Sequence, residues 1–234
     1  MMRHFALALC MMWLGLSGPG FAQGASGVVV ELFTSQGCST CPPADAYLEE
    51  LAQEPGVIAL ALHIDYWDYL GWKDKFGHKR FTDRQKAYST FIGSNTIYTP
   101  QMIVGGVDTV EGSDPDKVSA NIRRHKAADP KVVLQLTRSG GGVVIHAVAK
   151  TALAQPVTVQ MVRYTPLEHV AIEHGENAGH TIAYANIVTS WVRVGDWQGT
   201  EDLNLTVPMQ GDDPVVVILQ QQGPGLILAA SVLK

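Results

Sequence analysis

The feature that most constrains this chain is a pair of cysteines set between an apolar run and a helix-like stretch. Cys38 and Cys41 are three positions apart, residues 28–33 form the apolar run, and the helix-like stretch begins at Pro42. A thiol in the first turn of a helix faces unpaired backbone N–H groups and the positive end of the helix dipole. Both favour the thiolate, so Cys38 is predicted to be a nucleophile near neutral pH and Cys41 to resolve a mixed disulfide.

The first 22 residues are typical of a secretory signal peptide. Arg3 precedes an apolar stretch over residues 5–16, and small residues lead to a cleavage position after Ala22. The apolar stretch is shorter than the roughly 20 residues of a membrane span, so we expect no stable membrane insertion after signal removal. Cys10 leaves with this peptide. We therefore expect a periplasmic or secreted protein whose two remaining cysteines are Cys38 and Cys41, in a compartment where disulfides persist.

Between residues 28 and 128, apolar runs alternate with segments of helical periodicity. The patterns predict strands over residues 28–33, 57–64, 101–104 and 107–110 and helices over residues 42–54, 81–92 and about 113–126. The near-continuous apolar run at residues 57–64 is typical of a central strand covered on both faces. The order β-α-β-α-β-β-α predicts an α/β domain over residues 23–130.

The sequence pattern changes after Ala128-Asp129-Pro130. From there on, short β-rich runs recur between glycine and proline residues that are typical of turns. These runs cover residues 132–136, 143–149, 157–164, 187–194, 203–207, 215–219 and 226–232. None has helical periodicity, and many short strands in about 100 residues are typical of an antiparallel sandwich. The sequence therefore predicts a small all-β, sandwich-like domain over residues 131–234.

Charge and composition narrow the classes of partner. The formal net charge is −5 and the basic residues form no stripe, so we expect no binding to nucleic acid. A hydrophobic content of 46% is ordinary for a globular protein with a buried core. The expected partners are protein or small-molecule thiols and disulfides, with a redox partner protein among them.

Thr99-Pro100 opens the third predicted strand and is a second candidate for the site. A threonine–proline pair at this position resembles the cis-proline loop of thioredoxin-like proteins, which lies against the dithiol and pairs with the substrate polypeptide. Proline is the residue for which a cis peptide bond costs little. The alternative is an ordinary proline at a strand entry. With the dithiol upstream, we predict that Thr99 and Pro100 belong to the catalytic site.

Other interpretations of the cysteine pair remain open. A zinc site would need two more ligands, and no second cysteine pair exists. The thiolates could hold Cu(I), with Met102 or a histidine completing the site, because copper(I) prefers soft ligands. An inert structural disulfide is a further alternative, although so short a loop gains little stability from a bridge. We predict no bound cofactor and no resident metal.

Three other features are candidates with ordinary structural alternatives. Glu31 interrupts an apolar strand and is a candidate proton relay to Cys41, or a charge at a sheet edge or at the domain junction. The aromatic segment at residues 63–72 follows a central strand and is a candidate lid or recognition element, or plain packing. Histidines 169, 174 and 180 could bind a metal, but a polar loop is the simpler interpretation.

Residues 31–45, with the letters ELFTSQGCSTCPPAD, resemble the opening motif of the domain-of-unknown-function 1223 family, and residues 98–101 and 175–177 resemble its later motifs. The likeness covers essentially the whole mature chain. It implies an exported thioredoxin-like protein with a dithiol, and it implies no particular substrate. The chain departs from ordinary thioredoxin in having Ser39-Thr40 between the cysteines, no tryptophan just before them, and a long segment before Thr99.

These observations together predict a thiol–disulfide oxidoreductase, with Cys38 as nucleophile, Cys41 as resolving cysteine and Pro100 aligning the incoming chain. Whether it oxidises, reduces or isomerises depends on a reduction potential that the sequence does not give. One rival is a periplasmic copper-handling protein that uses the dithiol as soft ligands. Another is a binding module whose β domain, residues 131–234, docks a partner.

Overall fold

The structure is a computed structural model that describes residues 24–234. The predicted signal peptide and Cys10 lie outside the described residues. Strands occupy 44% and helices 19% of the structure. The predicted strands and helices all form near their expected positions, so local periodicity identified them correctly.

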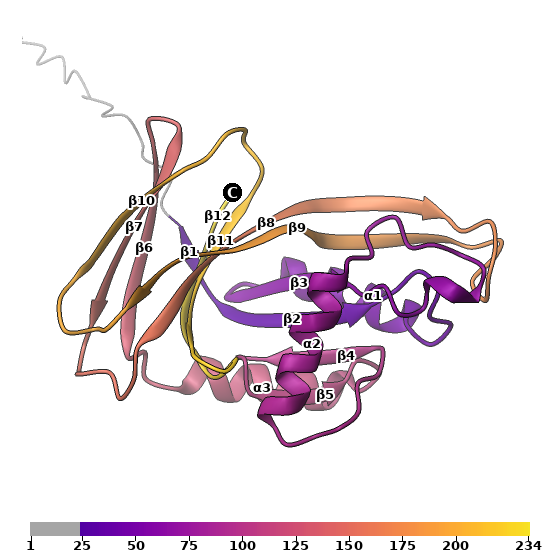
Figure 1. Ribbon diagram of the computed structural model, residues 1–234, viewed down its shortest axis with the longest axis horizontal. Coiled ribbons are helices and arrows are strands. Elements are labelled where there is room, and N and C mark those ends of the chain that lie inside the picture. The colour runs from indigo at the N-terminus through magenta and orange to yellow at the C-terminus, as the bar shows by residue number, and fades with distance from the viewer. Residues whose placement is uncertain (1–23) are drawn as a thin grey trace, which may run out of the picture.

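The chain contains three α-helices, one short 3₁₀-helix and twelve strands among the described residues (Figure 1). The helices are α1 (Pro42–Gln53), η1 (Asp68–Leu70), α2 (Lys79–Phe91) and α3 (Pro115–Ala127). The strands of the first half are β1 (Ala25–Ser26), β2 (Val28–Thr34), β3 (Val57–His63), β4 (Gln101–Val104) and β5 (Asp108–Glu111). The later strands are β6 (Val132–Ser139), β7 (Gly142–Ala149), β8 (Val157–Ala171), β9 (Thr181–Trp197), β10 (Leu203–Pro208), β11 (Val215–Gln221) and β12 (Ile227–Leu233).

Nine of these strands form one large, curled mixed sheet. Its strand order is β1-β12-β11-β8-β9-β3-β2-β4-β5. Strands β2 and β3 are parallel, β2 and β4 are antiparallel, and β3 meets β9 in parallel at the pair Ala61 and Ile187. Strands from both halves of the chain therefore share one hydrogen-bonded sheet.

Helices cover both faces of the sheet around β2 and β3. On one face, Leu48 of α1 and Ile122 of α3 pack against Leu32 and Ala61. On the other face, Phe81 and Tyr88 of α2 pack in a core with alternate residues of β2 and β3, among them Phe33 and Leu60. This layering explains why both strands are apolar almost throughout, because neither face of them meets water.

The remaining strands form a three-stranded sheet of order β10-β7-β6, which packs against the other end of the large sheet. Its apolar residues, including Leu136 and Ile145, lie in one core with Val217 of β11 and Val159 of β8. Figure 1 shows this small sheet beside β11 and β12, at the opposite end of the molecule from the tip of the long β8–β9 hairpin.

The predicted fold class, an α/β thioredoxin-like domain followed by a separate all-β sandwich, is wrong. The protein is mostly β, because β8, β9, β11 and β12 extend the sheet of the first half instead of forming their own sandwich. β11 shows the physical reason: Val216 and Ile218 face the helix-covered core, and Val217 and Leu219 face the small sheet. Such a strand is buried on both faces, so the large sheet takes part in both the helix-covered core and the core beneath the small sheet.

The division into residues 23–130 and 131–234 stays a prediction. No helix among residues 24–234 is long and apolar enough to cross a membrane.

Candidate functional site

The two cysteines form a disulfide at the start of α1. Their Cα atoms are 5.4 Å apart. Cys41 is the N-cap residue of the helix, its backbone carbonyl accepts the N–H groups of Ala44 and Asp45, and Pro42 fills the first helical position. Proline suits that position because its missing N–H has no partner in a first turn. The disulfide therefore lies where the sequence predicts, between β2 and the N-terminus of α1.

The two sulfurs differ in their surroundings. Cys38 is 3% exposed and Cys41 is fully buried, whereas Ser39 and Thr40 between them are exposed. The Thr40 hydroxyl lies 3.6 Å from the Cys38 sulfur. Cys38 is thus the more exposed of the two cysteines, although neighbouring side chains cover almost all of it.

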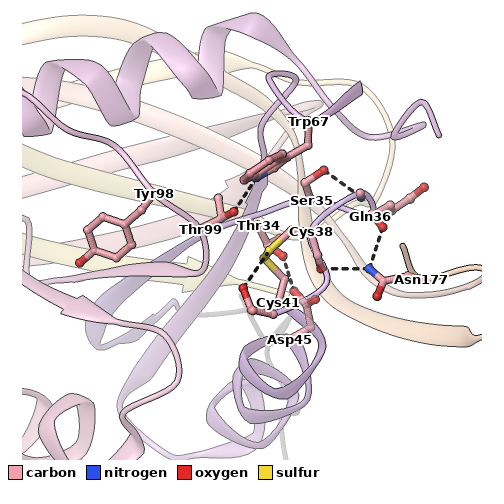
Figure 2. The surroundings of a disulfide bond; sticks show 12 residues. Thr34, Ser35, Gln36, Cys38, Cys41, Asp45, Trp67, Tyr98, Thr99 and Asn177 are labelled. Carbon is pink, nitrogen blue, oxygen red and sulfur yellow. Dashed lines mark hydrogen bonds between the residues drawn. A yellow bond between two sulfur atoms is a disulfide. The ribbon is translucent and has the colours of Figure 1, made fainter. Parts of the chain in front are cut away.

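Thr99 and Trp67 lie beside the disulfide and form part of that cover (Figure 2). The Trp67 indole N–H donates to the Thr99 hydroxyl over 2.7 Å. The Thr99–Pro100 peptide bond is cis, and Pro100 is buried. The structure therefore brings Cys38, Cys41, Thr99 and Pro100, the four residues that the sequence singles out, into one region.

The aromatic segment at residues 63–72 wraps the loop that carries Cys38. A Cβ atom built on Gly37 would lie 3.3 Å from Trp67, so the two backbones are in close contact. Trp72 donates its indole N–H to the side-chain oxygen of Gln36 over 2.8 Å. Tyr69 stacks on Trp67 and is 77% exposed. The segment both packs against the site and presents an aromatic ring to solvent.

Asp45 is a site residue that the sequence analysis missed. It stands one helical turn after Cys41, is buried, and accepts a 2.8 Å hydrogen bond from the Thr34 hydroxyl through Oδ1. Burial raises the pKa of the Asp45 carboxyl to about 7, against the opposing effects of the His63 charge and the Thr34 hydrogen bond. The signal was the spacing, since residues four apart in a helix are neighbours. Figure 2 shows Asp45 near Cys41, on the side away from Trp67.

Glu31, the acid that the sequence analysis considered for proton relay, lies elsewhere. It alternates along β2 with Thr34, so it points to the opposite face of the sheet from Asp45. There it accepts hydrogen bonds of 2.6 and 2.8 Å from Arg84 and one of 2.6 Å from Tyr88. Glu31 is therefore the centre of a buried ion pair, and its hydrogen bonds join α2 to the sheet.

Asn177 is a second residue whose part in the site the sequence did not reveal. Its side-chain amide donates 2.9 Å hydrogen bonds to the backbone carbonyls of Gln36 and Cys38. It lies in the loop of the β8–β9 hairpin, about 140 positions away in sequence, so only the tertiary fold brings it here. The later half of the chain thereby holds the loop that carries Cys38.

The candidate metal ligands are dispersed. His169, His174 and His180 are exposed along the hairpin, and the His174 ring lies against Trp72. No group of three or more His, Cys, Asp or Glu residues in the described part of the chain is arranged to hold a metal ion. Met102, the considered copper ligand, is buried in β4 beside Leu32.

These features define a class: a β-rich protein of two packed sheets with a disulfide at the N-terminus of a helix. More particularly, the chain belongs to the family described as Protein of unknown function (DUF1223), whose sequence profile matches residues 29–220. The family resemblance predicted from the sequence is thus confirmed. Comparison with curated proteins found no match.

Two solved structures are similar. The crystal structure of protein AGR_C_4864 from Agrobacterium tumefaciens is 32% identical, with a TM-score of 0.77 over 89% of this chain and 94% of that one. HBP35 of Porphyromonas gingivalis is 13% identical, with a TM-score of 0.59 over 89% of this chain and 74% of that one. The second likeness is one of fold alone.

Proposed function

We propose that this protein is a thiol–disulfide oxidoreductase that acts through Cys38 and Cys41. The observation that carries the proposal is the pairing of a helix-terminal disulfide with a buried carboxyl one turn behind Cys41, whose pKa of about 7 suits proton exchange near neutral pH. The second oxygen of this acid, Oδ2, is buried and has no hydrogen-bond partner within residues 24–234. Such a group costs stability, and a purely structural disulfide does not require it.

The reaction follows from the surroundings of the two sulfurs. A substrate thiolate attacks the Cys38 sulfur, the bond between the two cysteine sulfurs breaks, and its electron pair goes to the sulfur of Cys41. Because Cys41 is fully buried, bulk solvent cannot stabilise this thiolate. The Asp45 carboxyl gives it a proton, leaving a carboxylate held by the Thr34 hydroxyl. A second substrate thiolate then attacks the substrate sulfur, which releases the substrate disulfide and the Cys38 thiolate.

The other residues of the site have supporting parts in this proposal. Thr99 lies beside the disulfide, and Pro100 follows it through the cis peptide bond. Both are proposed to contact the incoming substrate. Trp67 must shift for a bulky reactant to reach Cys38, which is 3% exposed. The expected signal peptide, residues 1–22, supports activity in the cell envelope.

The test is exchange with glutathione disulfide and with a dithiol, using three forms of the protein. The wild type is expected to turn over, Cys38→Ser to lose exchange, and Cys41→Ser to accumulate one mixed disulfide per chain. The matched control is Ser39→Ala, which keeps both thiols and is expected to retain exchange. Undiminished turnover in Cys38→Ser, or a wild type no faster than a free dithiol in solution, would contradict the proposal.

A further inference from the structure

Three buried polar atoms without a hydrogen-bond partner in the described chain belong to side chains that lie near one another behind the disulfide. They are Asp45 Oδ2, His63 Nε2 and the Tyr184 hydroxyl. A buried polar atom left unpaired costs of the order of 1–3 kcal/mol, so several in one place require an explanation. Their chemistry is complementary, because the carboxylate oxygen accepts hydrogen bonds and the imidazole nitrogen and the hydroxyl can each donate or accept.

The strand register places these groups on one face of the sheet. Thr34 of β2 pairs with His63 of β3, so their side chains project to the same side, towards α1. Thr34 donates to Asp45, and the His63 ring makes an edge contact with Tyr184 at 4.9 Å between ring centroids. Asp45, His63 and Tyr184 therefore follow one another across α1, β3 and β9.

His63 is held in a defined orientation. Its Nδ1 lies 2.7 Å from an oxygen of Asp74, and both side chains are fully buried. Asp74 also accepts the backbone N–H of Gln36 over 2.9 Å, so the pair is attached to the loop that leads to Cys38. With Nδ1 occupied by Asp74, Nε2 of His63 is the atom left to exchange a proton.

We propose that these three atoms bind internal water, and that this water carries a proton between Asp45 and the His63–Asp74 pair whenever the disulfide opens or closes. A buried water molecule typically makes two to four hydrogen bonds to such groups. The inference rests on the proposed function, because it names the second proton-holding group of that same site. It goes further in assigning a chemical role to His63, Asp74 and Tyr184.

The proton balance is simplest in the direction of disulfide formation. The Cys38 thiolate attacks a substrate disulfide and releases one substrate thiolate. The Cys41 thiol gives its proton to the Asp45 carboxylate, and its sulfur attacks Cys38, which releases the second substrate thiolate. The internal water then passes the proton from Asp45 to Nε2 of His63, where the Asp74 carboxylate stabilises the imidazolium. Reduction of the disulfide runs these steps in reverse.

The titratable groups that face Asp45 come from each element packed against it. They are Cys41 from its own helix, His63 from β3, Asp74 from the segment after β3, and Tyr184 from β9. The positive charge of His63 lowers the pKa of Asp45, and the negative charge of Asp74 raises it. Removing the imidazole therefore makes Asp45 hold its proton to a higher pH.

The experiment titrates the protonated carboxyl of Asp45 in the oxidised full-length mature protein by its infrared C=O band, assigned by its loss in Asp45→Asn. In His63→Gln we expect the midpoint to rise by about one pH unit. Reduction of the disulfide by dithiothreitol should slow about tenfold and gain a solvent deuterium isotope effect. The matched control is His125→Gln, which removes a histidine of α3 paired with Asp108 of β5 and should change neither quantity.

Tyr184→Phe keeps the ring packing and removes only the hydroxyl, so it tests the water site even if His63→Gln fails to fold. We expect this variant to fold like the wild type and its disulfide to be reduced more slowly by dithiothreitol, with a solvent deuterium isotope effect. An unchanged midpoint in a folded His63→Gln, or unchanged kinetics in Tyr184→Phe, would overturn the inference. The infrared titration needs no turnover, so a shifted midpoint in a protein that exchanges no thiols would overturn the proposed function alone.

Discussion

Two buried carboxylates lie on opposite faces of the same sheet and differ in their hydrogen-bonding partners. Glu31 faces α2 and has both oxygens occupied, by Arg84 and Tyr88. Arg84 in turn lies 3.8 Å from the centre of the Trp191 ring. Asp45 lies in α1 on the other face, receives one hydrogen bond from Thr34, and has its second oxygen without a partner within residues 24–234.

In the proposed function, this difference separates an acid that stabilises the fold from an acid that exchanges protons. A carboxylate whose oxygens are both occupied by a guanidinium and a phenol ties structural elements together. A carboxyl with a pKa of about 7, and with one oxygen that no described residue hydrogen-bonds, can take and release a proton under physiological conditions. The four predictions below test this contrast, from the largest expected effect to the smallest.

Glu31→Gln should be the most damaging change to stability. It leaves the Arg84 guanidinium buried without its counter-charge, which typically costs about 3–5 kcal/mol of unfolding free energy. Urea denaturation at pH 7 measures the loss. Asp83→Asn is the control, because it breaks the exposed Lys79–Asp83 pair and should cost less than about 1 kcal/mol. Equal urea midpoints for Glu31→Gln and wild type would contradict the claim that Glu31 stabilises the fold.

Asp45→Asn should have the opposite effect, and only at high pH. The unfolded chain releases the proton near the ordinary value of 3.8, whereas the folded protein holds it up to about pH 7. Stability of the wild type therefore falls as pH rises through this window. The variant escapes this loss and should be more stable at pH 8, by as much as about 4 kcal/mol, and equal at pH 4. A difference that does not grow with pH would contradict the assignment.

Asn177→Ala should loosen the loop that carries Cys38. It removes two hydrogen bonds to the carbonyls of Gln36 and Cys38 and should cost about 2 kcal/mol of unfolding free energy. Thermal unfolding of the oxidised protein measures this. The control Asn204→Ala removes an exposed amide paired with His146 and should be almost neutral. Matching losses in the two variants would show that the hairpin tip does not support the site.

Trp67→Ala should uncover the disulfide without touching either carboxylate. Removing the indole that bonds Thr99 should speed reduction by dithiothreitol about fivefold, equivalent to about 1 kcal/mol in the barrier. Tyr69→Ala is the control, since that ring is already 77% exposed. A reduction rate equal to that of wild type would show that Trp67 does not restrict access to Cys38.

The sequence predicted the helices and strands and the position of the cysteine pair well, for physical reasons that are local. Apolar periodicity, the glycine and proline signals, and the short spacing of Cys38 and Cys41 all act over a few residues. The assembly of the later strands was predicted wrongly, because the run over residues 215–219 is apolar on both faces and local pattern does not reveal what covers it. β11 is covered by the α2 core on one side and the small sheet on the other.

The site shows the same limit. Glu31 and Asp45 are both acids close to the cysteines in sequence, and only the alternation of β2 and the turn of α1 decide which one faces Cys41. Asp45 could have been found from its helical spacing. Asn177, His63 and Tyr184 could not, because their relation to the cysteines depends on the pairing of β3 with β9 and on the hairpin folding back over the loop.

The most direct test of the central claim is the pH dependence of disulfide reduction in wild type and Asp45→Asn. The rate with dithiothreitol, divided by the concentration of its thiolate, should fall in wild type as pH rises through about 7, because ionised Asp45 has no proton for Cys41. In Asp45→Asn the rate should be low and independent of pH. The same descending profile in both proteins would show that the proton comes from another source and would contradict the account.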